Sequence, residues 1–178
     1  MPNKEYTGPH LLSPAPIVLL TSGTKEKGNV ATVAWSGVLT GSEVFVALRP
    51  SRYSYELIEQ SGEFALNIPT ADMIEAVDKC GVTSGRDMDK FKENGFTKFY
   101  CDEIKAPLIE ECYLNVACKV EESIRLGVHT MFVGKVVKKF MTDPAPKESE
   151  VIAYVGPHYY KIKPEELYLF GRSIEEGV

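Results

Sequence analysis

A short segment at residues 49–54 places two arginines and two serines at the expected start of a helix. It reads RPSRYS, with Arg49, Ser51, Arg52 and Ser54 close together. A helix N-terminus leaves backbone N–H groups free and carries the positive end of the helix dipole, so it favours anions. Guanidinium groups bind phosphate oxygens two at a time, and each charge-assisted hydrogen bond contributes roughly 1.5–3 kcal/mol. The segment predicts a phosphate-binding corner, although an exposed helix start with solvated arginines would have the same local sequence.

A second loop has the same character. Residues 80–91 read CGVTSGRDMDKF and again combine small hydroxyl side chains with cations before an expected helix. Gly85 allows backbone to approach a ligand closely. Two anion-suited loops are a more specific signal than either loop alone. The loop residues of interest are Thr83, Ser84, Gly85, Arg86 and Lys90.

A third segment, NVATVAWSG at residues 29–37, contains the single tryptophan, Trp35. Backbone and small side chains at Thr32, Ala34 and Ser36 could lie against a flat polar ring. A lone tryptophan is also a common core residue, and the sequence leaves that alternative open.

The composition predicts one folded domain without a nucleic-acid or membrane role. The chain has 178 residues, 44% of them apolar, and a net charge of −5. That charge argues against nucleic-acid binding by general electrostatics. No signal peptide or membrane-spanning segment is expected, so the sequence favours a cytoplasmic protein. We expect a single domain over residues 1–178, with a core at about 14–163 and a tail at 164–178.

The cysteines and histidines do not predict a metal site. Cys80, Cys101, Cys112 and Cys118 show no C-x-x-C spacing, and no histidine pair has the spacing of helical metal ligands. Cys112 and Cys118 share the parity of one expected strand face. The cysteines are therefore predicted to be reduced and mostly buried thiols.

Strand patterns dominate the chain, which predicts a mainly β fold, an antiparallel β-barrel with short peripheral helices. Gly28 and Asn29 are expected to form a turn with positive φ. Ser51 or Ser54 is the expected N-cap of the first helix, and Thr70 that of the second. The expected strands are 15–23, 30–40, 43–49, 63–68, 111–122, 128–141, 151–156 and 159–163, and the expected helices are 53–60, 70–79 and 88–93.

Six segments occur in an order that resembles the flavin reductase-like family, the group of flavoredoxin and ferric reductase. They are PIVLLTS, GNVATVAWSG, VFVALRPSRYSYELIEQSGEFALNIP, CGVTSGRDMDKF, APLIEECYLNVACKV and GVHTMFVGKV. The resemblance covers about Pro16 to Phe140. It implies an FMN-binding split β-barrel of Greek-key, antiparallel type, and a homodimer with the flavin near the subunit interface.

The resemblance also implies roles for individual residues. The isoalloxazine ring and ribityl chain would lie along Val33, Ala34, Trp35 and Ser36, with Thr32 next to them. The phosphate would lie among Arg49, Ser51, Arg52, Tyr53 and Ser54. Further contacts would come from Ser84, Gly85 and Lys90. His129 would approach the flavin edge, although a strand histidine with a local hydrogen bond is an equal alternative. No side chain is assigned as a catalytic acid or base, and no metal is implied.

The function implied is an FMN-dependent oxidoreductase that passes electrons from NAD(P)H through FMN to a small-molecule or protein acceptor. A non-enzymatic electron carrier that serves a redox protein is the alternative. A third interpretation is a related barrel that binds pyridoxal phosphate or a flavin used for sensing. No nicotinamide fingerprint is present, so the nicotinamide would have to stack on the flavin. No charged residue near Ser36 indicates a substrate-binding group.

Overall fold

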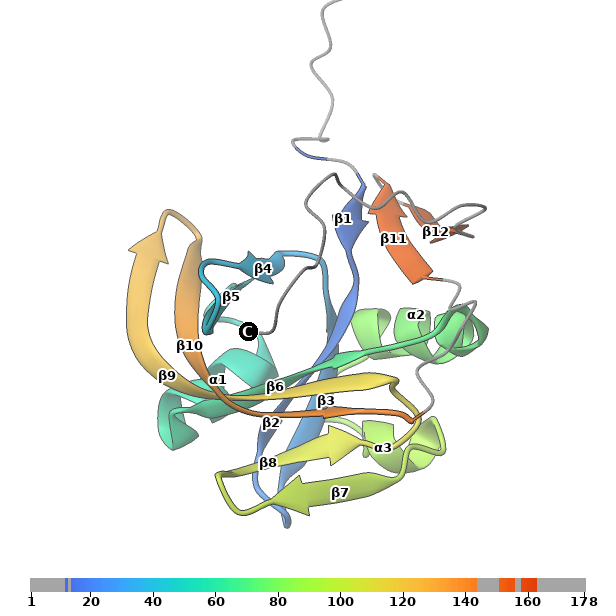
Figure 1. Ribbon diagram of the computed structural model, residues 1–178, viewed down its shortest axis with the longest axis horizontal. Helices are drawn as coiled ribbons and strands as arrows, with labels where there is room; N and C mark the ends of the chain where they lie inside the picture. The colour runs from blue at the N-terminus through green and yellow to red at the C-terminus, as the bar shows by residue number, and fades with distance from the viewer. Residues whose placement is uncertain (1–11, 13, 144–150, 156–157, 163–178) are drawn as a thin grey trace, which may run out of the picture.

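The computed structural model describes residues 12, 14–143, 151–155 and 158–162. These residues form a mainly β structure in which a curled antiparallel sheet carries helices at its sides (Figure 1). The strands are β1 Ala15–Pro16, β2 Val18–Gly23, β3 Gly28–Val33, β4 Ser36–Val38, β5 Glu43–Leu48, β6 Glu63–Ile68, β7 Lys98–Cys101, β8 Ile104–Ile109, β9 Leu114–Leu126, β10 His129–Met141, β11 Val151–Val155 and β12 His158–Ile162. The helices are α1 Tyr53–Ser61, α2 Ile74–Val82 and α3 Lys90–Glu93, and a 3₁₀ turn spans Ala71–Met73.

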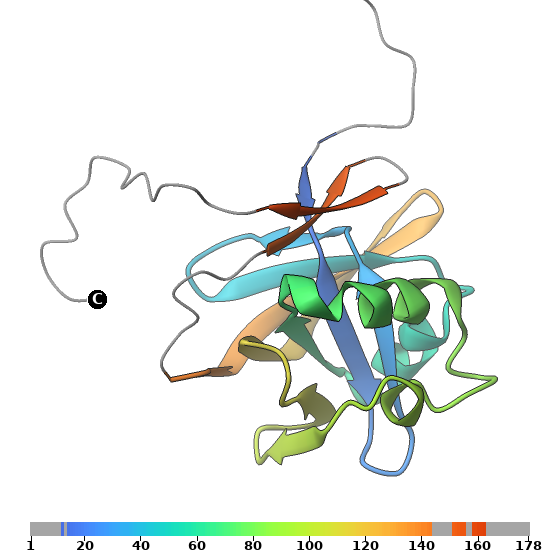
Figure 2. The same ribbon diagram turned by 90° about the vertical axis from the view of Figure 1, so that its right-hand side faces the viewer.

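The main sheet has seven strands in the order β3-β2-β6-β9-β10-β5-β4, and each neighbouring pair is antiparallel. The pairing of β9 with β10 shifts register between Val133 and Gly134 and again between Val136 and Lys138. Such bulges bend a strand and increase its twist, which accounts for the curl of this hairpin (Figure 1). The expected mainly β, antiparallel fold is confirmed. The strands β7-β8 and β1-β11-β12 form two smaller sheets, which lie on opposite sides of the main sheet's strands β2 and β3 in Figure 2.

Strand β2 is buried on both faces and therefore joins two apolar clusters. Leu19 packs in a cluster with Val77 of α2, whereas Leu20 packs in a second cluster with Phe64 and Phe132. The fully buried side chains are Leu19, Leu20, Phe64 and Val77, and Phe132 is 2% exposed. Burial on both faces fixes β2 and its partner β3, and these strands carry part of the candidate site.

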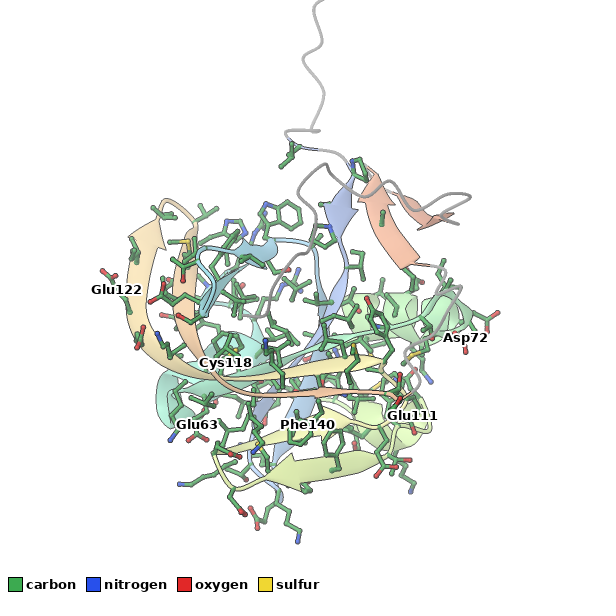
Figure 3. The ribbon with its side chains drawn as sticks, viewed as in Figure 1. Glu63, Asp72, Glu111, Cys118, Glu122 and Phe140 are labelled. Carbon is green, nitrogen blue, oxygen red and sulfur yellow. The ribbon has the colours of Figure 1, made fainter. Side chains whose placement is uncertain are left out.

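A third, smaller cluster lies under the β7–β8 hairpin. Phe140 of β10 meets Phe99 of β7 edge to face, with ring centroids 5.3 Å apart, and Leu108 of β8 is fully buried in the same cluster (Figure 3). The sequence analysis did not predict β7 or β8. Their alternation is interrupted by a register shift between Phe99 and Cys101, so neither strand shows a simple two-residue period.

The first hairpin turns at a different glycine from the one expected. Positive φ occurs at Gly23, at 94°, and not at Gly28, which pairs with Gly23 across the β2–β3 ladder. Asn29 is likewise a strand residue opposite Ser22. The turn is therefore at residues 24–27, where Thr24 N–H donates to Lys27 O at 3.2 Å. The prediction was wrong because Gly28 and Asn29 pair with β2 in the ladder, where the Asn29 side chain donates to Ser54 Oγ.

The expected strand over residues 30–40 is interrupted. Strand β3 ends at Val33 and β4 begins at Ser36, so Ala34 and Trp35 stand between two strands. The carbonyl of Trp35 accepts a hydrogen bond from the Ala47 N–H at 2.8 Å, which carries the chain across to β5. This break presents Trp35 at the surface rather than in a continuous strand.

The helix ends also differ from the prediction. The N-cap of α1 is Arg52, and neither Ser51 nor Ser54 caps the helix by a side-chain hydrogen bond. Thr70 precedes the 3₁₀ turn, also without a side-chain cap bond, and α2 continues to Val82. The third helix is shortened to α3 and is capped by Asp89, which accepts from the Phe91 and Lys92 N–H groups. Gly62 ends α1 in the left-handed conformation.

Strand β10 alternates between buried and half-buried positions. Thr130, Phe132 and Gly134 are buried, whereas the residues between them are half-buried, so only one face is fully covered. Gly127, at φ 57°, turns the chain between β9 and β10. The backbone of β11 and β12 confirms the last two predicted strands, whereas the predicted tail at 164–178 lies outside the described residues.

The four cysteines are free, and three of them are buried, as predicted. Burial raises the pKa of the Cys80 thiol to about 11 and that of Cys118 to about 12, so these thiols stay protonated at neutral pH. Cys112 lies before β9 in a different cluster from Cys118, so the two do not share a strand face. Cys118 lies inside the curled sheet, while Glu122 projects outward (Figure 3).

The described residues contain neither a candidate metal cluster nor a candidate membrane-spanning helix. No group of three or more His, Cys, Asp or Glu side chains in this part of the chain could hold a metal ion. None of the described helices combines the length and the apolar character that crossing a bilayer requires.

Candidate functional site

One cavity of about 410 Å³ collects residues from β3, β5, the start of α1, the α2–α3 loop and the start of β10. Small-molecule sites are typically clefts of about 300–1,000 Å³, so this volume suits a nucleotide-sized ligand. Twelve of the thirteen residues predicted to bind a cofactor line it, and His129 lines it as well. The exception is Ser36, which is buried at the start of β4 beside the lining and whose Oγ has no partner among the described residues.

Two arginines lie at the junction of β5 and α1. The turn between them is closed by the Arg52 N–H, which donates to Arg49 O at 3.0 Å. Both side chains are exposed, and neither forms an ion pair with a carboxylate in the described ranges. Because α1 has no side-chain cap and the Tyr55 N–H already donates to Arg52 O at 3.1 Å, the first-turn N–H groups that remain available to a ligand are those of Tyr53 and Ser54. Ser51 and Tyr53 line the cavity beside them.

The α2–α3 loop is fastened to α1 by Arg86. Its Nη2 lies 2.9 Å from Glu56 Oε2, and its Nη1 donates to Ser51 O at 3.3 Å. The guanidinium carbon lies 5.0 Å from the centre of the Tyr53 ring, within the range of a cation–π contact. These contacts hold Ser84 and the rest of the loop beside the start of α1. Glu56 therefore offsets the charge of Arg86 and leaves the other two arginines unneutralised.

Lys90 is a buried cation beside the same cavity. Its side chain is 4% exposed, and Nζ donates to the backbone carbonyl of Cys80 at 2.7 Å. Burial lowers the pKa of Lys90; nearby Cys80 opposes that shift, and Arg52 adds to it. The ammonium has no carboxylate partner in the described part of the chain. Such a desolvated cation favours the approach of an anion.

A buried polar pair lies between β3 and α1. Asn29 Nδ2 donates to Ser54 Oγ at 2.8 Å, and the two side chains are 3% and 2% exposed. Asn29 Oδ1 has no hydrogen-bond partner among the described residues. Gly85 packs directly over this oxygen, because a Cβ at Gly85 would lie 1.9 Å from it. The close approach of this loop to β3 requires glycine.

Trp35 and His129 form a flat part of the cavity lining, in contrast to the cationic part. Their rings stack with centroids 6.3 Å apart and an interplanar angle of 16°. Trp35 is 55% exposed, so the alternative of a core tryptophan is wrong. Val33 and Ala34 continue the lining, and the Thr32 hydroxyl donates to the Val77 carbonyl, which joins β3 to α2. The cavity thus has flat, apolar lining as well as cationic lining.

The sequence analysis did not count Asn29 or Arg86 among the cofactor-binding residues. Asn29 was assigned to a turn, and only the strand register shows that its side chain reaches the cavity. Arg86 lies in the loop at residues 80–91 and, like Lys90, is one of the cations that indicated anion binding there. The predicted cofactor contacts themselves stay predictions.

The donor set fits a ligand that joins an anionic end to a flat ring. Cations, hydroxyl groups and free helix N–H groups suit a phosphate, whereas small side chains and an exposed indole suit a planar heterocycle. A flavin mononucleotide has both parts.

The comparisons with known proteins agree with this geometry. Residues 11–163 match the Flavin reductase like domain, and the chain belongs to that family. An uncharacterized protein of Archaeoglobus fulgidus is 36% identical over 128 residues, which cover 71% of this chain and 72% of the relative. The ferric-chelate reductase (NAD(P)H) of the same organism is 21% identical over 147 residues, 82% of this chain and 83% of that protein.

Solved structures share the fold. The flavoredoxin of Desulfovibrio vulgaris (Miyazaki F) superposes with a TM-score of 0.84 at 24% identity, covering 98% of this chain and 100% of that one. An FMN-binding protein from Thermus thermophilus, with bound p-hydroxybenzaldehyde, has a TM-score of 0.82 at 20% identity, covering 95% and 100%. The expected flavin reductase-like split barrel is thereby confirmed.

Proposed function

We propose that this chain binds FMN in the cavity and is an oxidoreductase that passes electrons from NAD(P)H to a small-molecule or protein acceptor. The observation that carries the proposal is the convergence of Arg49, Arg52 and Lys90 on one cavity that Trp35 also lines. Membership of the flavin reductase-like family supports flavin as the ligand. The similarity to an FMN-binding protein and to an NAD(P)H-dependent ferric-chelate reductase supports the finer choices.

Different residues would bind the phosphate and the ring of the ligand. Arg49, Arg52 and Lys90 would neutralise the phosphate, and the hydroxyl groups of Ser51, Ser54 and Ser84 would add neutral donors. The backbone of residues 32–36 would lie along the ring and its polyol chain. When bound, the flavin supplies the redox chemistry, and the protein binds, orients and shields it. The exposure of Trp35 leaves the cavity edge open to a nicotinamide or to a redox partner.

We also propose that the protein is a cytoplasmic homodimer. Large apolar side chains stand exposed at Val38 (76%) of β4 and Leu39 (47%) after it, and at Leu126 (53%) of β9 and Val128 (67%) of the β9–β10 turn. Exposed apolar groups of this kind commonly mark an interface between subunits. The free cysteines are consistent with a reducing compartment.

The deciding experiment is anaerobic reduction. Purified protein is saturated with FMN, freed of excess, and mixed with NADH or NADPH while the flavin absorbance is followed. We expect rapid bleaching by one of the two nicotinamides. Bleaching by dithionite or a reduced protein but by neither nicotinamide would assign the electron-carrier function instead. A protein that neither carries nor takes up FMN would overturn both.

A further inference from the structure

The hydrogen bond between Asn29 and Ser54 has a defined direction. A side-chain amide nitrogen only donates, so Ser54 Oγ accepts in this 2.8 Å bond and keeps its own hydrogen. Among the described residues no acceptor takes that hydrogen. Both residues line the cavity that Arg49 and Arg52 also line. The hydroxyl of Ser54 is therefore a free donor in a cationic site, where the complementary group is an anionic oxygen.

Gly85 lies against the other end of the Asn29 amide. Its backbone closes over Asn29 Oδ1, since a Cβ there would lie 1.9 Å away, and the oxygen has no partner in the described part of the chain. A buried polar atom without a partner is uncommon and costs free energy, so it calls for an explanation. The free-energy cost of the unpaired Asn29 oxygen would be offset when an anion binds, because the Ser54 hydroxyl is then free to donate to that anion.

We propose that Asn29 is a positioning residue that makes the Ser54 hydroxyl a donor to a phosphate oxygen of the ligand. The inference rests on the proposed function, because it takes the anion to be the phosphate of FMN. The amide donates to the hydroxyl and the hydroxyl donates to the phosphate, so the two bonds point the same way and strengthen each other. Asn29 acts only through Ser54.

The test compares FMN with riboflavin, which has the same ring and polyol chain but no phosphate. Dissociation constants for both ligands are measured by flavin fluorescence with Asn29→Ala, Asn29→Asp, Ser54→Ala and the Asn29→Ala/Ser54→Ala double variant. We expect Ser54→Ala and Asn29→Asp each to weaken FMN by about tenfold or more, since a charge-assisted hydrogen bond is lost. Aspartate only accepts, so it would turn the Ser54 hydrogen away from the ligand.

The double-mutant cycle separates a positioning role from an independent contact. We expect the double variant to bind FMN as weakly as Ser54→Ala alone does. We expect the dissociation constant of riboflavin to change by less than about twofold in every variant. Should Asn29→Ala fail to fold, Asn29→Ser takes its place in the cycle.

Two results would overturn the inference. One is that Asn29→Ala and Ser54→Ala each weaken FMN binding and that their fold-losses multiply in the double variant. The other is an equal loss of riboflavin and FMN affinity. Wild-type protein that binds neither ligand would instead refute the proposed function, so the two failures are distinguishable.

Discussion

Arg86 and Glu56 join two segments that are 30 residues apart in the chain, with Nη2 and Oε2 separated by 2.9 Å. The pair fastens the α2–α3 loop to the first turn of α1 and neutralises one cation of the candidate site. Both side chains are more than one-third exposed, at 46% and 41%, so their contribution to stability is small.

Glu56→Gln is therefore expected to change ligand affinity more than stability. Removing the carboxylate frees the Arg86 guanidinium for the ligand, and FMN binding should tighten by up to about tenfold. The free energy of unfolding should fall by no more than about 1 kcal/mol. Glu93→Gln, which breaks the equally exposed pair with Lys79, is the matched control and should leave FMN affinity unchanged. Weaker binding by Glu56→Gln would show that the pair is needed to hold the loop.

Loss of the two unpaired arginines should release the ligand without unfolding the protein. Arg49→Ala and Arg52→Ala each remove a charge-assisted contact to the phosphate, so we expect FMN affinity to fall about 10- to 100-fold for each. Both side chains are exposed, so the melting temperature of the ligand-free protein should stay the same. Arg125→Ala, on the exposed part of β9, is the control for loss of one surface arginine. Full retention of FMN by the Arg49→Ala/Arg52→Ala double variant would refute the assigned corner.

A methyl group at Gly85 should disrupt the site. Because the Cβ would lie 1.9 Å from Asn29 Oδ1, the loop or the asparagine must move in Gly85→Ala. We expect a loss of about 1–3 kcal/mol in stability, from overpacking, together with weaker FMN binding. Gly41→Ala is the control, since no atom lies within 4 Å of the added Cβ there. Chemical denaturation and a flavin titration measure the two effects, and an unaltered Gly85→Ala would show that the loop yields freely.

Lys90 should make the free energy of unfolding depend on pH in the alkaline range. Its pKa in the folded protein is lowered, chiefly by burial, below its ordinary value of 10.5. Between the lowered pKa and that value the unfolded chain holds more protons, so the free energy of unfolding contributed by Lys90 rises with pH. Relative to Lys90→Met, the wild type should therefore gain stability as the pH rises toward 10.5.

Urea denaturation of the ligand-free proteins across that range measures the difference. Lys92→Met, an exposed lysine on the same helix, is the control. A stability gap between wild type and Lys90→Met that is constant with pH would contradict the shifted pKa.

A charge on the β9–β10 turn should separate the subunits. Val128 is 67% exposed, and Val128→Glu would place a carboxylate in the proposed apolar contact. We expect light scattering to report a dimer for the wild type and a monomer for the variant. Met141→Glu changes a similarly exposed side chain, 62%, at the far end of β10 and should remain dimeric. A wild-type monomer would refute the proposed assembly.

The local pattern of the chain determined most of the elements and the chemistry of the site. Alternation over residues 63–68 predicts a strand because successive side chains of a strand point to opposite faces, and the apolar run at 17–20 predicts one because a strand buried on both faces is apolar throughout. The arginines and serines at 49–54 predict anion binding because a helix start gathers donors wherever it lies. These are properties of neighbouring residues, and they need no knowledge of distant contacts.

Tertiary structure alone decided which residues meet. Asn29 looked like a turn residue, yet the pairing of β2 with β3 moves the turn to 24–27 and brings its side chain to Ser54. Trp35 became a surface ring because the strand breaks at Ala34, and Arg86 reached Glu56 only when the loop packed against α1. Register and long-range packing depend on the sum of many distant contacts, so a local pattern predicts the chemistry of a segment better than its partners.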